Sequence, residues 1–432
     1  MKHPTPSKHL IVVGGPTASG KTAFAIRLAR HFGTAILSAD SRQFYRELNI
    51  GTAKPTEEEL QQAPHYFINS LSIGEEYSVG DFERDAMQVL EDLFSRQDTA
   101  ILVGGSGLYI KALCEGLDDF PDVPPAVRRQ VEEEYRAKGL AHLQEELART
   151  DPEYYQEVDR QNPHRLIRAV AVSRASGQPF SRFRKSARRP RPFTPIYLQL
   201  HWPRRELYRR INRRVEQMVA AGLLEEARSL YPERHLAALQ TVGYQELFDH
   251  FDGTLSQEEA IALIQRNSRR YAKRQLTWYR RDGHWLLLRP DDRALALQYI
   301  EAVRNEGVSL QYHKEYAAAP ARSQEAMEVR ILKNSEIFAA INYSESKREA
   351  LLEGPFMKQP DIWAGRLLLY QGALMADERR IFAFTALEDE PLDELFAIAE
   401  PGPGELPNWI ASRREVFREK HSGGRVVGLA WK

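Results

Sequence analysis

Residues 10–22, LIVVGGPTASGKT, join a short apolar run to a glycine-rich loop and to the first residues of a helical pattern. The apolar run 10–13 predicts a buried strand, and the glycines after it predict a loop. Residues 22–32 carry apolar side chains at helical spacing and are followed by Gly33, which is typical of a helix end. A strand, a glycine-rich loop and a helix in this order predict a phosphate-binding loop.

The predicted phosphate-binding loop fits the pattern G-x-x-x-x-G-K-[ST], and its members are Gly15, Pro16, Thr17, Ala18, Ser19, Gly20, Lys21 and Thr22. The backbone N–H groups of such a loop, together with the start of the next helix, offer partial positive charge to phosphate oxygens. Lys21 adds a full charge, and the Thr22 hydroxyl can bind a phosphate oxygen or Mg²⁺. We interpret these eight residues as a pyrophosphate-binding loop.

Further strands and helices alternate along the first hundred residues. Residues 35–39 and 100–103 predict short buried strands, and residues 81–97 between them predict an amphipathic helix. Such alternation is typical of a parallel sheet that is flanked by helices. The predicted fold class is therefore α/β, a P-loop NTPase-like sheet.

The pattern changes after about residue 118. FPDVPP at 120–125 predicts a linker, residues 126–138, 140–149 and 162–174 predict helices, and residues 195–201 predict a returning strand. We therefore expect a core made of 1–118 and 196–310 with a mainly helical insertion at 119–195. Residues 311–432 predict a small mixed α+β C-terminal domain of unknown role, with a linker at 317–320 and strands at 366–370 and 380–384.

Charge is balanced over the chain but not along it. The 60 Lys and Arg equal the 60 Asp and Glu, yet residues 161–290 hold 25 basic against 11 acidic residues. This local excess of 14 positive charges indicates a surface for a polyanion, whereas residues 311–432, with 16 basic and 19 acidic residues, make a poor RNA surface.

Composition also excludes several classes of protein. The single cysteine, Cys114, excludes an intrachain disulfide framework and a multi-cysteine zinc site, and it suits the cytosol. A membrane span needs about 18 consecutive apolar residues, which the sequence lacks. We expect a cytoplasmic monomer.

Asp40 is the candidate catalytic acid. The third predicted strand runs into AILVGGSGLY without an acid, so the nearest carboxylate is Asp40, at the end of the second strand. The carboxyl ends of parallel strands meet at one edge of a sheet, so Asp40 is expected to face Lys21 and Thr22. An acid beside a pyrophosphate site suits a general base. The alternative is an aspartate that only caps the turn at Ser41.

Five segments in this order resemble the bacterial tRNA dimethylallyltransferase family, also called tRNA isopentenyltransferases. They are GPTASGKT (15–22), DSRQFYRELNIGTAKP (40–55), LVGGSGLYIKAL (102–113), QTVGYQE (240–246) and YAKRQLTW (271–278), and the similarity covers about residues 8–303. The resemblance implies the Mg²⁺-dependent transfer of a dimethylallyl group from dimethylallyl pyrophosphate to N6 of adenosine 37 in tRNA. The extension after residue 310 and Pro124, where an acid is expected, depart from the family pattern.

The resemblance also implies roles for particular residues. The implied catalytic residues are Asp40, Lys21, Thr22 and Arg214, the last as a second pyrophosphate cation. The residues expected to contact tRNA, beside Asp40, are Ser41, Arg42, Gln43, Ser106, His164, Arg165, Leu166, Ile167, Arg168, Gln240, Thr241, Val242, Gly243, Tyr244, Gln245, Lys273, Arg274 and Arg280.

Purely structural roles for these residues also remain possible interpretations of the sequence. Residues 41–43 could form a solvated loop, Ser106 could serve a plain turn, and any single arginine could be a solvated surface charge. Two other functions also remain: a small-molecule kinase that uses ATP on the same scaffold, and a non-catalytic RNA-binding protein. Intact Lys21, Thr22 and Asp40 count against the second of these.

Overall fold

The protein is described by a computed structural model, which covers residues 8–184, 189–282, 284–314, 325–333, 335–345, 349–357, 362–377, 379–385, 396–399 and 425–431. The chain divides into two compact units, one made of Met1–Ile110 with Pro192–Lys432 and the other of Lys111–Arg191. The domain boundaries expected from the sequence remain an interpretation, and the linker expected at 317–320 lies outside the described residues. Among the described helices, none combines the length and the apolar character that crossing a membrane requires.

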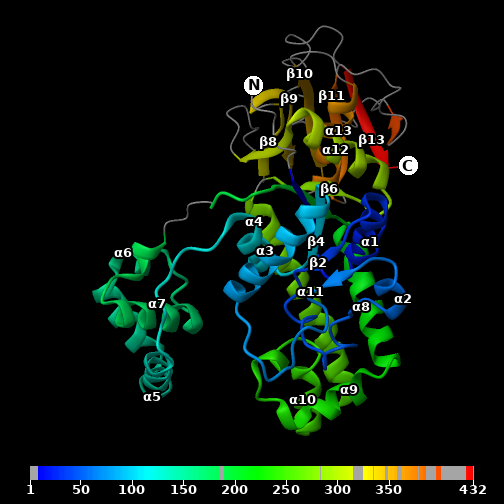
Figure 1. The fold of residues 1–432 in the computed structure, drawn as a ribbon. Coiled ribbons are helices and arrows are strands. Elements are labelled where there is room, and N and C mark those ends of the chain that lie inside the picture. Colours follow the sequence, from blue (N-terminus) through cyan, green and yellow to red (C-terminus); the bar gives the residue numbers. More distant parts are fainter. Residues whose placement is uncertain are drawn as a thin grey trace. The chain divides into compact units, whose positions relative to one another are not determined.

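A parallel sheet forms the centre of the first unit (Figure 1). Its strands lie in the order β3 (His65–Tyr66), β2 (Ile36–Ser38), β4 (Thr99–Gly104), β1 (His9–Gly14), β5 (Thr194–Leu200) and β6 (Leu286–Leu288), and each pairs in parallel with its neighbours. Every residue of β1 and β4 is buried, which is why both read as continuous apolar runs. The predicted α/β fold class is confirmed.

Helices surround this sheet and carry several site residues. They are α1 (Lys21–Phe32), α2 (Glu57–Leu60), α3 (Val79–Arg96), α4 (Gly107–Glu115), α8 (Arg204–Ala220), α9 (Leu223–Leu230), α10 (Gln245–Phe251), α11 (Gln257–Asp282) and α12 (Arg293–Glu306). As the sequence predicts, α1 ends at Gly33, whose φ of 61° lies in the left-handed region. The α4 helix contains the boundary between the two units.

The second unit is helical, as predicted for the insertion. It contains α5 (Pro125–Thr150), α6 (Pro152–Glu157) and α7 (Pro163–Ser176). Gly139 interrupts α5 with a φ of 78° and a ψ of −176°, so the two helices expected at 126–138 and 140–149 are distinct segments. Apolar side chains of α5 and α7, among them Val131, Leu143 and Leu166, form the core of this unit.

A second sheet follows the core in sequence. Its order is β12 (Phe396–Ala399), β13 (Arg425–Trp431), β11 (Arg380–Thr385), β10 (Glu349–Met357), β9 (Glu336–Glu345), β8 (Glu325–Lys333) and β7 (Val308–Lys314). The pair β10 and β11 is parallel and is joined by α13 (Ile362–Met375), while the other pairs are antiparallel. The expected mixed α+β character is therefore confirmed, and so is the strand at 380–384.

The strand predicted at 366–370 is wrong, because these residues belong to α13. Residues 367–370 are all buried. A helix that is covered on all sides has no polar face, so its sequence lacks the 3.6-residue periodicity that identifies a surface helix. A short apolar run of this kind cannot be assigned to helix or strand from its pattern alone.

Gly104 offers a test of how closely β4 and β2 approach at the site. A Cβ atom on Gly104 would lie 2.3 Å from the backbone oxygen of Ala39, the residue before Asp40. We expect Gly104→Ala to lower the free energy of unfolding by about 1–3 kcal/mol, because backbone atoms must move to make room. Equilibrium urea unfolding measures the change.

Gly80→Ala in α3 is the matched control. Its new Cβ would lie 3.6 Å from the Ser78 hydroxyl oxygen, an ordinary contact distance, and alanine favours a helix. The control should unfold at the same or a higher urea concentration than the unsubstituted chain. Equal stability of Gly104→Ala and Gly80→Ala would contradict the close approach of these strands.

Candidate active site

The phosphate-binding loop connects β1 to α1, and two side chains bind its backbone: Trp202, just before α8, and Arg210 in α8. The indole N–H of Trp202 donates to the Ser19 carbonyl oxygen at 2.9 Å, and Arg210 Nε donates to the Ala18 carbonyl oxygen at 2.9 Å. The Arg210 guanidinium also lies 4.4 Å from the centre of the Trp202 ring. Ala18 and Gly20 have φ values of 63° and 90°, so the loop turns sharply just where α8 holds it.

Gln275 of α11 links this loop to the end of β4. Its side-chain oxygen accepts a hydrogen bond from the Thr17 N–H at 2.9 Å, and its side-chain nitrogen donates to the Gly105 carbonyl oxygen at 3.0 Å. Gln275 is buried, and a buried amide is stable only when its donors and acceptors are paired. Sequence analysis assigned Gln275 no role, although it lies within the YAKRQLTW segment.

A cavity of about 1190 Å³ lies beside the phosphate-binding loop. Lys21, Thr22, Asp40 and Arg214 all line it, so Asp40 faces the same space as the loop, as the strand-end argument expected. Gly15, Pro16 and Ser19 do not line it. Ser19 is fully buried, so its side chain lies behind the cavity wall.

Positive charge dominates this cavity. Among the described residues, eight Lys or Arg and three Asp or Glu line it. Burial lowers the pKa of Lys21 to about 8; Asp40 opposes this shift and Arg214 adds to it. Burial also lowers the pKa of Arg214, and Asp40 again opposes the shift. Cations that are buried together favour an anionic ligand between them.

Arg214 contacts two separate segments that line the cavity, one at Thr17 and the other at Ala53. One of its terminal nitrogens lies 3.4 Å from the Thr17 hydroxyl, and the other donates to the Ala53 carbonyl oxygen at 3.3 Å. Arg210 and Arg214 are four residues apart on α8, so both side chains lie on the same face of the helix. This spacing was the signal by which sequence analysis could have joined Arg210 to Arg214.

The segment after Asp40 is held by hydrogen bonds within the chain. The Gln43 amide donates to the carbonyl oxygens of Thr52 and Ala53, each at 3.3 Å. The Ser106 hydroxyl accepts from the Ser41 N–H at 3.2 Å. Ser106 thus does more than serve a turn in its own loop, because it joins the loop after β4 to the segment after β2.

Arg42 and the 240–245 segment meet at the same cavity. Arg42 donates to the Ala237 carbonyl oxygen at 3.2 Å, and Gln240, Thr241, Val242, Gly243 and Gln245 line the cavity together with Arg42. The expectation that Tyr244 contacts tRNA is corrected, because Tyr244 is fully buried.

Tyr244 instead belongs to a cluster that sequence analysis missed. Its hydroxyl donates to Glu226 at 2.7 Å, and the same carboxylate accepts the backbone N–H groups of Asn49, Ile50 and Gly51 at 3.1, 2.8 and 2.9 Å. Glu226 therefore fixes the loop whose later carbonyl groups, at residues 52 and 53, hold Gln43 and Arg214. The Glu226 side chain gave no sequence signal, since its three backbone partners, at residues 49–51, are 175–177 residues away in the chain.

The expected tRNA-contacting residues of α7 do not share one environment. His164, Arg165 and Arg168 are exposed. Leu166 is fully buried, which corrects the expectation that it contacts RNA, because the helical period turns its side chain toward the core of this unit. Ile167 is half-buried and packs against the same core, and its contact with RNA stays a prediction. On α11, Lys273, Arg274 and Arg280 are exposed as expected.

Tyr271 is a further cavity residue that sequence analysis did not single out. Its side chain is 37% exposed, and it lines the cavity together with Asp40 and Arg274. The Arg274 guanidinium lies 5.5 Å from the centre of its ring. Tyr271 thus offers an aromatic face to a ligand.

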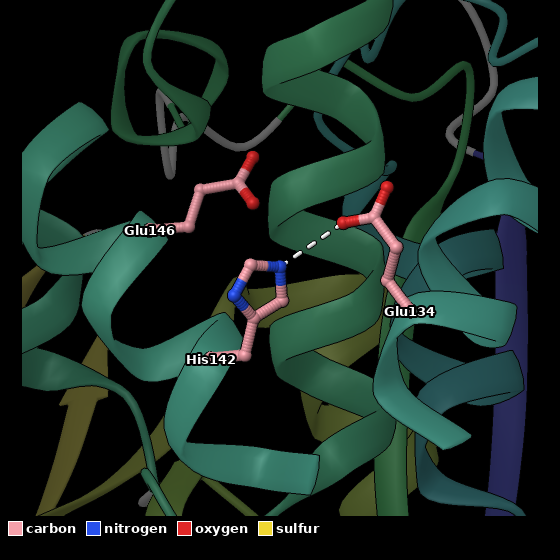
Figure 2. A group of neighbouring side chains, drawn as sticks. All are labelled: Glu134, His142 and Glu146. Carbon is pink, nitrogen blue, oxygen red and sulfur yellow. Dashed lines mark hydrogen bonds and ion pairs between the residues drawn. The ribbon is translucent and has the colours of Figure 1, made fainter. Parts of the chain in front are cut away.

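Glu134, His142 and Glu146 of α5 form the candidate metal cluster of the described residues. Figure 2 shows His142 between the two carboxylates, with its ring nitrogen bound to Glu134 at 3.1 Å. The Arg174 guanidinium occupies the same oxygens: it donates to Glu134 at 2.9 and 2.8 Å and to Glu146 at 2.7 and 2.6 Å. A cation is therefore already in place, and the group is an ion-pair network.

The parallel sheet, with a glycine-rich loop at the end of β1 and an acid after β2, defines a P-loop NTPase-like fold with a cavity whose charged lining residues are mostly basic. The family model described as IPP transferase matches residues 43–282. The chain belongs to this family.

Individual relatives agree with the family match. A tRNA dimethylallyltransferase of Christiangramia forsetii is 52% identical over 276 residues, which cover 64% of this chain and 91% of that protein. One of Cytophaga hutchinsonii is 48% identical over 300 residues, which cover 69% of this chain and 99% of that protein. The chain is therefore longer than these relatives.

Solved structures show the same fold. A tRNA isopentenylpyrophosphate transferase of Bacillus halodurans is 35% identical, with a TM-score of 0.50, and the match covers 69% of this chain and 95% of that one. A eukaryotic dimethylallyltransferase acting on tRNA is 21% identical, with a TM-score of 0.59, over 74% of this chain and 92% of that one. At this identity the second likeness concerns the fold alone.

The lowered pKa of Lys21 predicts how anion binding depends on pH. Lys21 attracts a pyrophosphate ester only when protonated, and its pKa in the free protein is about 8. The affinity for an alkyl pyrophosphate should therefore fall above pH 8, approaching about tenfold per pH unit. Isothermal titration calorimetry between pH 7 and 9.5 measures this slope.

Lys21→Arg is the control for the pH dependence, because arginine stays charged over this range. We expect its affinity, although weaker at pH 7, to change little up to pH 9.5. The same slope in the unsubstituted chain and in Lys21→Arg would show that another group causes the pH dependence.

Proposed function

We propose that this chain transfers a dimethylallyl group from dimethylallyl pyrophosphate to N6 of adenosine 37 in tRNA. The observation that carries the proposal is one cavity in which a carboxylate, Asp40, shares the lining with the phosphate-binding loop and Arg214. The names of the similar proteins support the choice of tRNA and of the dimethylallyl group.

The phosphate-binding loop and two cations receive the leaving group. When the allylic C–O bond breaks, the bonding electrons leave with pyrophosphate, whose negative charge grows. Lys21 and Arg214 are already in place beside the loop, so they stabilise this charge without reorganisation. Since both cations are partly deprived of water, their attraction for the leaving group exceeds that of solvated side chains.

Asp40 acts as the general base. The lone pair of adenine N6 is delocalised into the ring, which makes the neutral amine a poor nucleophile. As N6 forms its bond to the allylic carbon, one N6 proton passes to a carboxylate oxygen of Asp40, and the product amine is neutral. A positioned base of this kind contributes about 10²–10⁴-fold to the rate.

Magnesium fits the same end of the cavity. The Thr22 hydroxyl and the Asp40 carboxylate both line it, and hard oxygen donors are what Mg²⁺ prefers, together with water and phosphate oxygens. We assign Thr22 as the protein ligand. When bound, the ion would add positive charge at the pyrophosphate oxygens. We do not assign it to the Glu134 cluster, where Arg174 already binds the carboxylates.

The adenine must leave the stack of the anticodon loop before it can react. Ser41, Arg42 and Gln43, which line the cavity directly after Asp40, are our proposed contacts for the extruded base, with Ser106 fixing Ser41 in place. Exposed cations on α7 and α11, among them Arg165 and Lys273, are proposed to bind the phosphates of the anticodon stem-loop, where arginine and lysine supply sequence-independent affinity. We propose that the reaction takes place in the cytoplasm.

The relatives support a prenyl transferase rather than the ATP-dependent kinase that sequence analysis left open. Incubation of unmodified tRNA with the protein, Mg²⁺ and dimethylallyl pyrophosphate, followed by mass spectrometry of the nucleosides, tests the proposal. We expect N6-dimethylallyl adenosine at position 37. ATP consumption without a prenylated nucleoside would favour the kinase.

Asp40→Asn tests the base directly. The substitution keeps the size of the side chain but removes its ability to accept a proton, so the single-turnover rate should fall by about 10²–10⁴-fold. Fluorescence titration with tRNA should give a dissociation constant close to that of the unsubstituted chain. A near-normal single-turnover rate would rule out Asp40 as the base.

A further inference from the structure

The C-terminal extension, which lies beyond the part of the chain that matches the family, packs against the core sheet. About two thirds of this chain accounts for 91–99% of the curated relatives, so the rest has no counterpart in them. Its helix α13 packs against β6 of the core sheet: Leu286 and Leu288 share one apolar cluster with Leu367 and Leu368. Residues of α13 and β6 are in direct contact.

Gln371 of α13 completes the free edge of the core sheet. Strand β6 is an edge strand that pairs with β5 alone among the described strands, and an edge strand leaves backbone N–H and C=O groups unpaired. The Leu287 N–H donates to the Gln371 side-chain oxygen at 2.7 Å, and the Gln371 side-chain nitrogen donates to the Leu287 carbonyl oxygen at 3.0 Å. This fully buried amide thus replaces the peptide group of a neighbouring strand.

The Tyr312 hydroxyl extends the same contact. It lies 2.9 Å from the Gln371 side-chain oxygen and 3.0 Å from the carbonyl oxygen of Trp285, the residue before β6. Buried polar groups are stable only in a fixed geometry with their partners. The interface therefore specifies one docking position, which an apolar contact alone would not do.

The residues after β6 connect α13 to the phosphate-binding loop. The Tyr370 hydroxyl accepts the Arg289 N–H at 3.2 Å. The next carbonyl, that of Pro290, accepts from Arg27 of α1 at 2.7 Å. The Pro290 ring lies 3.8 Å from the position that a Cβ on Gly20 would take. One short segment is thus held by α13 on one side and contacts the loop and α1 on the other.

A second connection runs to α8. Asp377, just after α13, accepts the N–H of Arg204 at 3.1 Å. Arg204 is the first residue of α8, and the preceding Pro203 provides no side-chain cap. A carboxylate at this position satisfies an unpaired N–H and interacts favourably with the helix dipole. The helix that it caps carries Arg210 and Arg214.

We infer that α13 is an internal brace of the pyrophosphate site and that Tyr370, Gln371 and Asp377 are positioning residues. They hold the segment after β6 and the start of α8 against the phosphate-binding loop, so the surface that they form binds the chain's own core and not an RNA. This inference rests on the proposed function only in that the cavity binds pyrophosphate.

The test uses the full chain with Tyr370→Phe, Asp377→Ala and the double variant, and inorganic pyrophosphate as the probe. Each single variant should weaken pyrophosphate binding about three- to fivefold and the double variant about tenfold or more, as expected for lost hydrogen bonds. In steady-state assays the KM for dimethylallyl pyrophosphate should rise while the KM for tRNA stays constant. A merely structural role would lower the amount of active enzyme and leave both KM values unchanged.

Ile337→Thr is the matched control, because Ile337 lies in β9 of the sheet against which α13 packs, and its side chain is 42% exposed. It should bind pyrophosphate like the unsubstituted chain. If a brace variant fails to fold, hydrogen exchange of the unsubstituted chain decides: pyrophosphate should slow exchange of the peptides that contain Leu287, Arg289 and Arg204.

The possible outcomes separate the two proposals. Unchanged pyrophosphate affinity in the double variant, or unchanged exchange at these peptides when pyrophosphate is bound, overturns the brace. If the unsubstituted chain does not bind pyrophosphate at all, the proposed function fails first and the brace fails with it.

Discussion

The structure of this site depends above all on two cations that line the same cavity, Lys21 of the phosphate-binding loop and Arg214 of α8. Lys21 and Arg214 are both deprived of water, which lowers the pKa of each, and Asp40 is the acid that opposes both shifts. Such an arrangement is costly in the empty protein. In the proposed function, a pyrophosphate group between the two cations would supply the missing negative charge, so the cost of holding them together would favour the binding of that ligand.

The fold meets this constraint with contacts from distant parts of the chain. Trp202 just before α8, Arg210 in α8 and Gln275 in α11 all bind the backbone of the loop. Glu226 fixes the backbone of residues 49–51, close to the carbonyl group to which Arg214 donates. Each contact binds a backbone group of the site, so the side chains of Lys21 and Thr22, which line the cavity, are not needed to keep the loop in shape.

The sequence predicted the part of this account that depends on local patterns. The phosphate-binding loop, the strands beside it and the position of Asp40 follow from residue spacing and from the rule that parallel strand ends meet. The roles of Gln275 and Glu226 could not be predicted, because the site backbone groups that they bind lie 170 residues or more away, and a single sequence does not record such pairs. Tyr244 and Leu166 were misjudged for a related reason: a motif marks a segment, but only the helix or turn around each residue determines whether its side chain faces solvent. The helical state of residues 366–370 was hidden by burial on all sides, which removes the polar face that a pattern needs.

The central claim is that adenine N6 and the Asp40 carboxylate meet in this cavity when both substrates are bound. The most direct measurement is a crystal structure of the chain with a non-reactive thio analogue of dimethylallyl pyrophosphate and an anticodon stem-loop. The account predicts the pyrophosphate against Lys21, Thr22 and Arg214, and adenine N6 within hydrogen-bond reach, about 3 Å, of an Asp40 carboxylate oxygen. Adenine bound elsewhere, or Asp40 turned away from N6 with both substrates in place, would contradict it.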